Sequence, residues 1–373
     1  MCLKLGFIGG GISSSIGRVH FVASQLDNHW NVVSGFFSRD QKINKDTSEL
    51  WGIDKSRTYN SLEEFIVSES ERIDAVVILT PAPRHKKDIL RIMDAGIPII
   101  CEKPMTSSLD EALLIKEKAK GKNNLLSVTY NYSGYPMVRE LRSLVEKGKL
   151  GKIHRIDLEM PQEGFIRINP TTGKLNKPKE WRLSDGDIPT ICLDLGIHLH
   201  HLANFLTGEE PTHVMSKFSN SLVYENIVDD AMLWLKYDIG LTGSFWMSKV
   251  ALGSRNGLKI RLYGTKASAT WEQTDSENLL VCYKDGSRVS VDRSTKALSC
   301  GEYRYNRYTV GHPAGFIEAF ANLYNDLYDV IRIKSLAHKH NSPYVYGINH
   351  SVAGMRLFSA AKQSNDQGCW VKV

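Results

Sequence analysis

The sequence predicts an α/β chain of two domains, the first built on a doubly wound parallel sheet and the second on an antiparallel sheet. The chain has 373 residues, which exceeds the usual size of one hydrophobic core. Its first third alternates short β-branched runs with longer amphipathic stretches, whereas most of the remainder shows strand-like alternation. We therefore expect domains over residues 1–130 and 131–373, with room for the C-terminal helix to pack back on the first.

Five short apolar runs predict the strands of the first domain. They are Lys4–Ile8, Val32–Phe37, Ala75–Leu79, Ile97–Cys101 and Leu125–Tyr130. Helical periodicity covers Arg84–Ala95 and Ser107–Lys120, and the second stretch opens on serines and acidic residues that favour a helix N-terminus. Strands that alternate with helices in this way form a parallel sheet covered by helices.

After Gly151, apolar residues recur at every second position, which is typical of strands with one exposed face. The expected strands are Ile153–Met160, Ala231–Tyr237, Leu241–Met247, Leu258–Tyr263, Leu279–Tyr283 and a final Cys369–Val373. Turns rich in Gly, Asp and Asn join them and favour antiparallel pairing. Helices are expected around Leu193–Leu206, Gly315–Leu327 and Tyr346–Ala361.

The composition is that of an ordinary globular protein with a weak basic excess. Apolar residues make up 42% and charged residues 24%, and the net charge is +6. The basic residues are spread along the chain, which suits an anionic cofactor or substrate. Nucleic acid is not expected, since its recognition needs a clustered basic face. No apolar run approaches the roughly 20 residues of a membrane helix, so we expect no membrane partner.

Cysteine usage and the N-terminus predict a cytoplasmic protein. The cysteines show neither a CxxC pair nor the close spacing of a disulfide or zinc framework. The chain starts directly with a strand and lacks the regions of a signal peptide. Reduced thiols are therefore expected at Cys2, Cys101, Cys192, Cys282, Cys300 and Cys369.

A glycine-rich segment follows the first strand and opens a helix. Without Cβ atoms at Gly9 and Gly11, backbone N–H groups can approach a pyrophosphate, and the helix N-terminus adds partial positive charge. Ser13 and Ser14 can add hydroxyl donors, and Ile16 belongs to the same segment. Because the glycines follow an N-terminal strand, we expect a bound dinucleotide here rather than only a tight turn.

The end of the second strand is where NAD and NADP should be distinguished. An acid such as Asp40 would accept a hydrogen bond from a ribose 2′-hydroxyl, whereas Ser38 and Arg39 can donate to a 2′-phosphate. An exposed, solvated arginine explains Arg39 equally well. The sequence leaves both cofactors open and favours NADP only slightly.

Lys103 follows the fourth strand, within the sequence Glu102-Lys103-Pro104. In open parallel sheets the residues just past the carboxyl ends of the strands line the ligand crevice, which separates Lys103 from ordinary surface lysines. An ammonium group there can hold a substrate hydroxyl and lower its pKa. We therefore expect Lys103 to be catalytic.

Asp194 and His198 lie four residues apart in a predicted helix. At α-helical spacing they share one face, so the carboxylate can orient the imidazole for acid–base work, although a packing histidine is the alternative. His200 and His201 crowd the same segment. A zinc site needs at least three protein ligands and a third has no obvious source here, so we expect no metal.

Taken together, these motifs resemble the Gfo/Idh/MocA superfamily, named after glucose–fructose oxidoreductase, inositol dehydrogenase and rhizopine catabolism. The resemblance covers nearly the whole chain. The matching segments are Gly9-x-Gly11 through Ile16-Gly17-x-x-His20, Thr80-Pro81-x-x-x-His85, Ala95-Gly96 before Glu102-Lys103-Pro104-Met105, Asp194-x-Gly196-x-His198, and His312-x-x-Gly315-x-x-x-Ala319-Phe320.

The resemblance implies a Rossmann domain and a second domain with a large, open, mostly antiparallel sheet, whose exposed face mediates a homodimer or homotetramer. It implies hydride transfer between NAD or NADP and a secondary alcohol or ketone of a sugar, an inositol-like polyol or a nucleotide-linked sugar. Lys103 would bind substrate beside the nicotinamide, often before a cis proline, and His198 would be the acid–base group with Asp194 as its partner. The implied cofactor contacts include Thr80, Pro81, His85, Glu102 and Lys103.

Five residues are expected to contact the substrate, by their position and type. They are Asn131, Trp181, Arg182, His201 and His312. Aromatic side chains stack on sugar rings and arginine binds phosphate or carboxylate, although a packing role explains Trp181 equally well. His201 stands where many relatives have an aspartate, and the serine-rich phosphate loop is longer than the common form.

Two other functions fit the same resemblance. Some relatives are non-catalytic, dinucleotide-sensing regulators, but those should lack a catalytic residue, and this chain keeps Lys103, Asp194 and His198. The other alternative is a sugar–sugar oxidoreductase or lyase that retains its cofactor.

Overall fold

The structure is a computed structural model that describes residues 2–122, 125–175, 178, 180–220, 223–294, 302–334 and 342–373. Cys300 lies outside the described residues. The chain divides into two compact units. The first comprises Met1–Gly134 and Phe316–Val352, and the second comprises Tyr135–Gly315 and Ala353–Val373.

The first unit contains a five-stranded sheet in which every pair of neighbours is parallel, as predicted. The strand order is β2-β1-β3-β4-β5. The strands are β1 (Leu3–Gly9), β2 (Trp30–Phe36), β3 (Ala75–Leu79), β4 (Ile99–Cys101) and β5 (Leu126–Val128). Strands β3, β4 and β5 are buried at every residue, which explains why they appear in the sequence as continuous apolar runs.

Helices connect most of these strands, and two further helices of this unit come from the C-terminal part of the chain. They are α1 (Ser15–Gln25), α2 (Gln41–Trp51), α3 (Leu62–Glu69), α4 (Ala82–Asp94), α5 (Leu109–Lys118), α8 (Phe316–Lys334) and the first residues of α9 (Ile348–Gln367). The hydroxyls of Ser14, Ser61 and Ser108 accept backbone N–H groups at the N-termini of α1, α3 and α5. Helices α2 and α3 were not predicted, because α2 is strongly polar and α3 has only eight residues.

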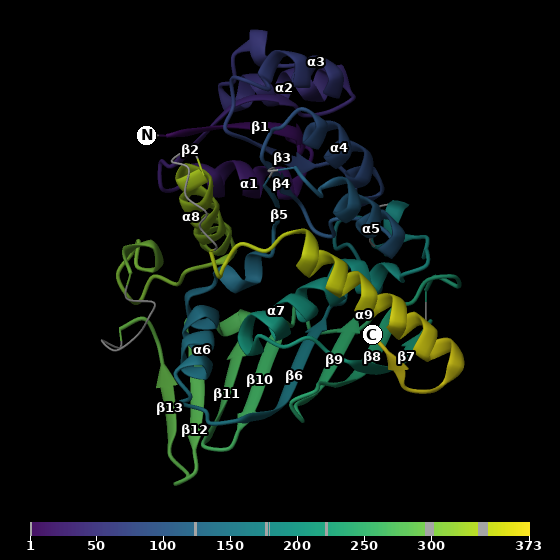
Figure 1. The fold of residues 1–373 in the computed structure, drawn as a ribbon, viewed down its shortest axis with the longest axis vertical. Coiled ribbons are helices and arrows are strands. Elements are labelled where there is room, and N and C mark those ends of the chain that lie inside the picture. Colours follow the sequence, from purple (N-terminus) through teal and green to yellow (C-terminus); the bar gives the residue numbers. More distant parts are fainter. Residues whose placement is uncertain are drawn as a thin grey trace. The chain divides into compact units, whose positions relative to one another are not determined.

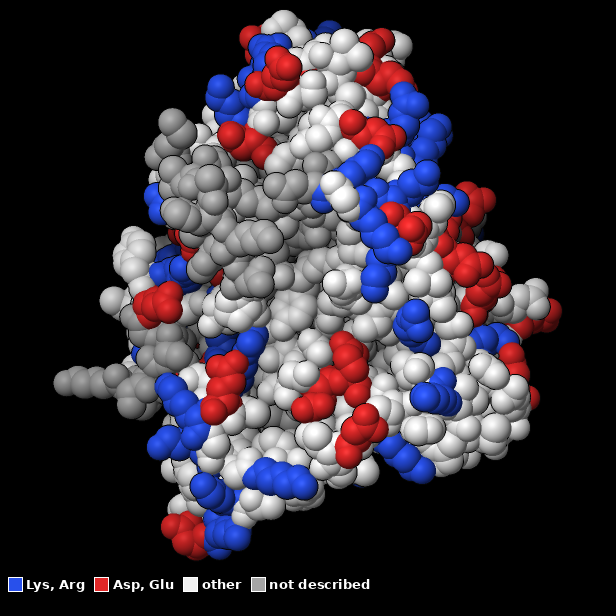
Figure 2. All heavy atoms as spheres, viewed as in Figure 1, with Lys and Arg blue, Asp and Glu red and all other residues white. Residues whose placement is uncertain are grey.

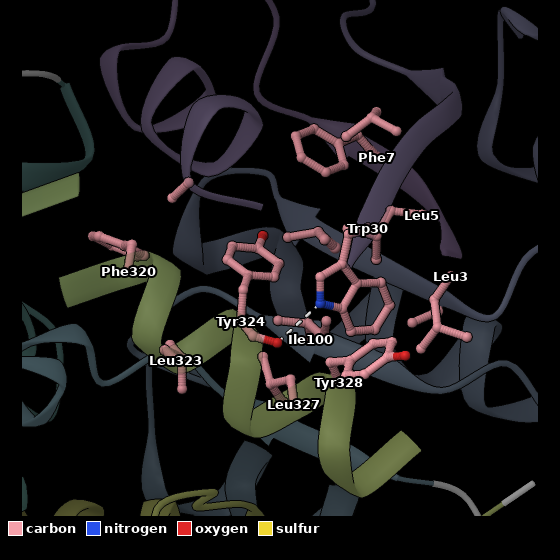
Figure 3. Packing of buried hydrophobic residues seen from close by; sticks show 14 of the residues in the cluster. Leu3, Leu5, Phe7, Trp30, Ile100, Phe320, Leu323, Tyr324, Leu327 and Tyr328 are labelled. Atoms are coloured by element: carbon pink, nitrogen blue, oxygen red, sulfur yellow. Dashed lines mark hydrogen bonds between the residues drawn. The ribbon is translucent and has the colours of Figure 1, made fainter. Parts of the chain in front are cut away.

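Helix α8 completes the hydrophobic core of the first unit. Its Phe320, Tyr324 and Leu327 pack in one buried cluster with side chains of β1 and β2 (Figure 3). The indole N–H of Trp30 donates to the carbonyl of Tyr324 over 2.9 Å, which Figure 3 draws as a dashed line between the two residues. Because the indole is buried, this hydrogen bond satisfies a donor that would otherwise cost free energy.

The second unit contains a nine-stranded sheet in the order β13-β12-β11-β10-β6-β9-β8-β7-β14. Its pairs are antiparallel apart from β6 with β9, which agrees with the prediction of a mostly antiparallel sheet. The strands are β6 (Ile153–Pro161), β7 (His213–Ser219), β8 (Asp230–Lys236), β9 (Thr242–Ser248), β10 (Lys259–Gly264), β11 (Ala267–Glu272), β12 (Leu279–Tyr283), β13 (Arg288–Val291) and β14 (Val371–Lys372). The sequence did not predict β7, β11 and β13, which carry many small or polar residues.

Helices α6 (Pro136–Glu146), α7 (Ile197–Thr207) and most of α9 lie over one face of the large sheet (Figure 1). Side chains of α9 also meet the backbone of β7. The N–H of Ser216 donates to the hydroxyl of Ser364 over 3.1 Å, and the N–H of Phe218 donates to Asn365 Oδ1 over 2.8 Å. The helical layer is therefore anchored to the sheet by hydrogen bonds as well as by apolar packing.

The surface carries both signs of charge. On the face shown in Figure 2, basic and acidic side chains are interspersed, in keeping with the diffuse basic excess of the sequence. Among the described residues, no helix has the length and apolar character needed to cross a membrane.

The packing of α8 leads to a first prediction. Leu327→Ala should lower the free energy of unfolding by roughly 2–5 kcal/mol, because Leu327 is fully buried in the core and its truncation leaves a cavity. Leu50→Ala is the matched control, since Leu50 on α2 is 65% exposed and its truncation should change stability by less than about 0.5 kcal/mol. Urea-induced unfolding measures both values, and equal losses would contradict the core assignment of α8.

Candidate active site

The carboxyl edge of the parallel sheet gathers the segments that the sequence analysis selected in the first unit. Strand β1 lies between β2 and β3, and Gly9 at its end pairs in register with Leu79 at the end of β3. Gly9 has a φ of 81°, and a Cβ there would lie 2.9 Å from backbone atoms of Leu79 and Thr80. The strand order changes direction between β1 and β3, and open α/β sheets bind ligands at such a point.

The glycine-rich loop is held in shape by hydrogen bonds to the segments that follow β2. The N–H of Gly11 donates to the carbonyl of Phe37 over 3.2 Å, and the N–H of Ile12 donates to Thr47 Oγ1 over 3.0 Å. A Cβ at Gly17 would lie only 1.8 Å from the carbonyl oxygen of Gly10, so helix α1 packs directly on the loop. Side chains at these positions would clash with the loop, so the glycines keep it close to the N-terminus of α1, where a pyrophosphate can be bound.

The serines of the loop have different environments. The Ser14 hydroxyl accepts the N–H of Gly17 over 3.2 Å and thereby caps α1. Ser13 is exposed, while Ile16 is half-buried in the first turn of the helix. Among the predicted hydroxyl donors, Ser13 is therefore the more accessible to a ligand.

The residues after β2 differ in what they can offer an adenosine ribose. Asp40 Oδ1 accepts the N–H groups of Lys42 and Ile43 over 2.9 and 3.2 Å, so this carboxylate caps helix α2. Ser38 Oγ accepts the N–H of Asp40 over 3.1 Å, and Arg39 is exposed. Asp40, the carboxylate that could accept a hydrogen bond from a ribose 2′-hydroxyl, therefore already caps α2.

His85 ties together the ends of β3 and β4. Its Nε2 lies 2.7 Å from the carbonyl oxygen of Thr80, and its Nδ1 lies 2.8 Å from that of Pro104. The ring is buried, and the Thr80 hydroxyl donates to Asp88 Oδ2 over 2.7 Å. His85 therefore shapes the edge of the site, and Pro81 begins α4 as its N-cap residue beside it.

Glu102 and Lys103 follow β4 at the same edge. Glu102 is buried, and its Oε1 accepts from His20 Nε2 over 3.0 Å and from the hydroxyl of Thr129. Burial alone would raise the pKa of Glu102, but the hydrogen bond from His20 and the charge of Lys103 hold it below its usual value. Lys103 is half-buried and precedes a cis peptide bond to Pro104.

Asn131 is the substrate candidate of the first unit. It follows β5 in a short 3₁₀ helix and is 3% exposed. Its Nδ2 makes no hydrogen bond within the described part of the chain. A buried amide donor without a partner is costly, and a ligand that accepts a hydrogen bond would remove that cost.

In the second unit, Asp194 lies in a π-helix (Cys192–Gly196) that runs directly into α7. The N–H of Ile197 donates to the carbonyl of Cys192, five residues earlier. The prediction of α-helical spacing between Asp194 and His198 was therefore wrong, because the first of the two lies in a wider turn. Such π-turns are frequent at functional sites.

Two cations hold the Asp194 carboxylate. Arg182 donates from Nε to Oδ2 and from Nη2 to Oδ1, each over 3.1 Å, and Lys249 Nζ donates to Oδ2 over 2.6 Å. Lys249 also donates to Gln162 Oε1 over 2.7 Å. Both Asp194 and Lys249 are buried, so each charge needs the other as its partner.

These residues line a pocket of the second unit. Arg182, Asp194 and Lys249 form its charged part, and Phe165, Ile191 and Ile227 contribute apolar side chains. The Arg182 guanidinium also lies 4.6 Å from the ring centroid of Trp181, which is half-buried. The pocket has an empty volume of about 190 Å³, which is smaller than the roughly 300–1,000 Å³ of most ligand sites.

The histidines of α7 are all buried but have different neighbours. His198 is 4% exposed, and His200 Nε2 lies 2.7 Å from Glu210 Oε2. Burial strongly lowers the pKa of His201, with help from the charges of His200, His198 and Arg142, and its ring packs on Phe205. His201 is therefore a neutral, 1% exposed side chain in the structure.

His312, the last substrate candidate, lies in an exposed segment of the second unit, with its Nδ1 3.3 Å from the Thr309 hydroxyl. Two residues of the charged cluster were not predicted. Lys249 directly follows β9, and Gln162 directly follows β6. In the sequence, Lys249 is marked only as a lysine that directly follows an alternating strand. Nothing in the sequence identifies its partner, so it could not be separated from other lysines.

Comparisons with known proteins identify the family. Residues 3–130 match the model of the oxidoreductase family with an NAD-binding Rossmann fold, and residues 138–270 match the Gfo/Idh/MocA C-terminal domain. Over 99% of its length the chain is 26% identical to YfiI, an uncharacterized oxidoreductase of Bacillus subtilis, 96% of which is covered. It is 27% identical to the scyllo-inositol 2-dehydrogenase (NAD(+)) of the same organism, over 62% of this chain and 64% of that protein.

Two solved structures share the whole architecture. An inositol dehydrogenase homolog from Azotobacter vinelandii, complexed with NADH and myo-inositol, is 26% identical and superposes with a TM-score of 0.88 over 100% of this chain and 98% of its own. An oxidoreductase from Sinorhizobium meliloti is 29% identical, with a TM-score of 0.86 over 100% of both chains. The two matched models, in family order and together spanning most of the sequence, show that this chain belongs to the Gfo/Idh/MocA oxidoreductase family and has its NAD-binding Rossmann domain.

Proposed function

We propose that the chain transfers a hydride between a nicotinamide dinucleotide and a secondary alcohol or ketone of a sugar or an inositol-like polyol. The observation that carries this proposal is the Rossmann edge, where the glycine-rich loop follows β1 and Lys103 follows β4, two strands of the parallel sheet with β3 between them. A side chain at Gly9 or Gly17 would clash with neighbouring backbone, so these glycines allow the close packing that holds the loop at the N-terminus of α1, where a dinucleotide phosphate can bind. The similarity to a scyllo-inositol 2-dehydrogenase and to an inositol dehydrogenase homolog supports a cyclic polyol as substrate.

The chemistry is divided between the two units. Bound NAD or NADP supplies the hydride acceptor. His198 takes the proton of the substrate hydroxyl as the carbon–hydrogen bond breaks, and Lys103 stabilises the developing alkoxide through its ammonium group. In the opposite direction His198 returns the proton to the carbonyl oxygen. We assign Asp194, which pairs with Arg182 and Lys249, as the carboxylate partner of His198, as the family resemblance implies.

The remaining candidates fit roles in binding. Asn131 offers a buried amide donor to a substrate hydroxyl or to the nicotinamide. Arg182 lines the pocket of the second unit, and its guanidinium lies over the ring of Trp181. His312 is exposed and serves a substrate that reaches beyond the pocket, whereas His201 is buried and supports α7.

The assignment of Lys103 and His198 makes a direct prediction. Lys103→Met and His198→Asn should each lower kcat by on the order of a hundredfold or more, because each removes a group that acts on the reacting oxygen. The dissociation constant for NADH, measured by fluorescence, should stay within about threefold. Assays use myo-inositol, scyllo-inositol and a panel of aldoses and polyols.

Lys116→Met and His213→Asn are matched controls, since both side chains are exposed outside the proposed site. Unchanged turnover in Lys103→Met and His198→Asn would refute the roles given to them. A wild-type protein that binds NADH and turns over no member of the panel would favour a dinucleotide sensor. Copurified cofactor without net reduction would favour a sugar–sugar oxidoreductase or lyase.

We further propose that Ser38 and Arg39 give the site a preference for NADP over NAD. Asp40 is engaged in capping α2, so the polar groups left for the ribose 2′ position are a hydroxyl and a guanidinium. The Azotobacter vinelandii relative is complexed with NADH, so NAD is the reference against which the preference is measured.

Arg39→Ala should reduce the ratio of kcat/KM for NADP to that for NAD roughly tenfold, because a charge-assisted hydrogen bond to the 2′-phosphate is lost. Steady-state kinetics with both cofactors give this ratio. Arg288→Ala, in an exposed position of the second unit, should leave it unchanged. An unaltered ratio in Arg39→Ala would show that Arg39 does not select the cofactor.

We also propose that the open face of the large sheet forms a homodimer or homotetramer. Strand pairing puts Trp234, Ser244, Asp157 and Arg261 in one row across β8, β9, β6 and β10, and Trp234 is 43% exposed. An exposed tryptophan on a sheet face is typical of a surface that another protein covers. Tyr263 lies two residues along β10 on the same face and is also exposed.

Trp234→Glu should lower the molar mass in solution by a whole-number factor, because it places a charge in the proposed interface. Light scattering after size-exclusion chromatography measures the mass. Tyr303→Glu, at an 82% exposed site outside this sheet, is the control. A wild-type monomer, or an unchanged mass in Trp234→Glu, would rule this interface out.

A further inference from the structure

A buried hydrogen-bonded network connects four elements of the first unit to the residue that precedes Lys103. It consists of His20 from α1, Tyr324 from α8, Glu102 after β4 and Thr129 after β5. His20 is 0%, Tyr324 1% and Thr129 1% exposed, and Glu102 is 8% exposed. Polar groups this deeply buried are retained only when their hydrogen bonds are satisfied.

One arrangement of protons satisfies the whole network. The Tyr324 hydroxyl donates to His20 Nδ1 over 2.7 Å, and His20 Nε2–H donates to Glu102 Oε1 over 3.0 Å. The Thr129 hydroxyl donates to the same oxygen. Burial raises the pKa of Tyr324 well above its usual value, with a further contribution from Glu102, so the tyrosine keeps the proton that it donates.

The network also fixes the backbone on which Lys103 is carried. The N–H of Glu102 donates to the carbonyl of Ile78 over 3.0 Å, and the N–H of Thr129 donates to the carbonyl of Cys101 over 2.9 Å. Both the side chain and the backbone of Glu102 are therefore held, and Lys103 is the next residue. His20 lies in α1, three residues after Gly17, which packs closely against Gly10 of the phosphate loop. The network therefore joins the helix behind this loop to the residue before Lys103.

We propose that His20 is a positioning residue that holds the Glu102 carboxylate, ionised and in one orientation, beside Lys103, and so links the dinucleotide-binding helix to the reacting centre. The proposal rests on the function proposed for Lys103. The negative charge of Glu102 attracts the ammonium group of Lys103, which is the group that can stabilise an alkoxide, and this attraction also lowers the pKa of Glu102. His20 acts through Glu102 and touches neither substrate nor cofactor in this account.

Loss of His20 should change how Glu102 titrates. Burial raises the pKa of Glu102, whereas the hydrogen bond from His20, the charge of Lys103 and the hydroxyl of Thr129 lower it. Tyr324 and Cys101 are the other titratable groups that face this carboxylate, and both stay protonated because burial raises their pKa. Without His20 the pKa of Glu102 should rise, so the carboxylate becomes protonated as the pH falls, at a pH where the wild type is still ionised.

The test compares His20→Phe with His20→Gln. Phenylalanine removes the donor and keeps a ring, whereas the glutamine amide can still donate to Glu102 Oε1. Infrared difference spectra of the protein without substrate follow the protonated-carboxyl band during acidification. The band should form at a pH about one unit or more higher in His20→Phe than in the wild type. It should remain near the wild-type position in His20→Gln and be missing from the double variant His20→Phe, Glu102→Gln.

Turnover should follow the same titration. With myo-inositol or another accepted polyol at saturation, kcat of His20→Phe should fall roughly tenfold at the acid end of its profile and recover towards the wild-type value at higher pH. A purely structural role of His20 would lower the thermal midpoint without moving either titration. Tyr324→Phe, which removes the donor to Nδ1 and leaves the ring in the core, provides a second variant if His20→Phe fails to fold, and its band should shift in the same direction.

Two results would overturn the proposal. One is a carboxyl band at the same pH in the wild type, His20→Phe and Tyr324→Phe. The other is a shifted band with an unchanged pH profile of kcat, because the carboxylate would then not matter to Lys103. If the wild type oxidises no polyol or sugar, the function proposed for Lys103 fails, and an unshifted band would show separately that His20 does not hold Glu102.

Discussion

Parallel pairing of β1 with β2 and β3 is the constraint on which the first unit depends. It places the ends of all three strands at one edge of the sheet, so that Gly9, Phe36 and Leu79 finish next to one another. Residues that are dozens of positions apart then share one environment without any direct bond between their side chains. The glycines after β1 are needed because two backbones approach each other there, as the contact between Gly10 and Gly17 shows.

The fold was largely predictable from the sequence because most of its strands are either fully buried or alternate between buried and exposed residues. The runs around Val76 and Phe245 carry these two patterns clearly, and both were found. Strand β13 was missed because its side chains are mostly exposed and polar, so no apolar periodicity marks it. The eight residues of α3 give too few turns for a helical period to stand out.

The candidate site was only partly predictable, for a different physical reason. A motif marks residues that are neighbours in sequence, whereas the ion pairs of Asp194 join it to Arg182 and Lys249, 12 and 55 positions away. The π-turn at Asp194 depends on packing, since Gly196 leaves room for Phe358 and Met247, where a Cβ would lie 2.6 and 2.9 Å from their side-chain atoms. Local spacing rules assume a regular helix and therefore misplace such a residue.

The long-range position of α8 has a consequence for how the chain folds. Trp30 and Tyr324, joined by a hydrogen bond, are 294 positions apart, and residues 135–315 form the other unit between them. A ribosome that releases the chain from its N-terminus delivers β1 and β2 long before the helix that covers them. Until then an apolar face that includes Trp30 and Leu5 has no permanent cover. High contact order slows folding, so this face is where the growing chain most needs a chaperone or a transient substitute for α8.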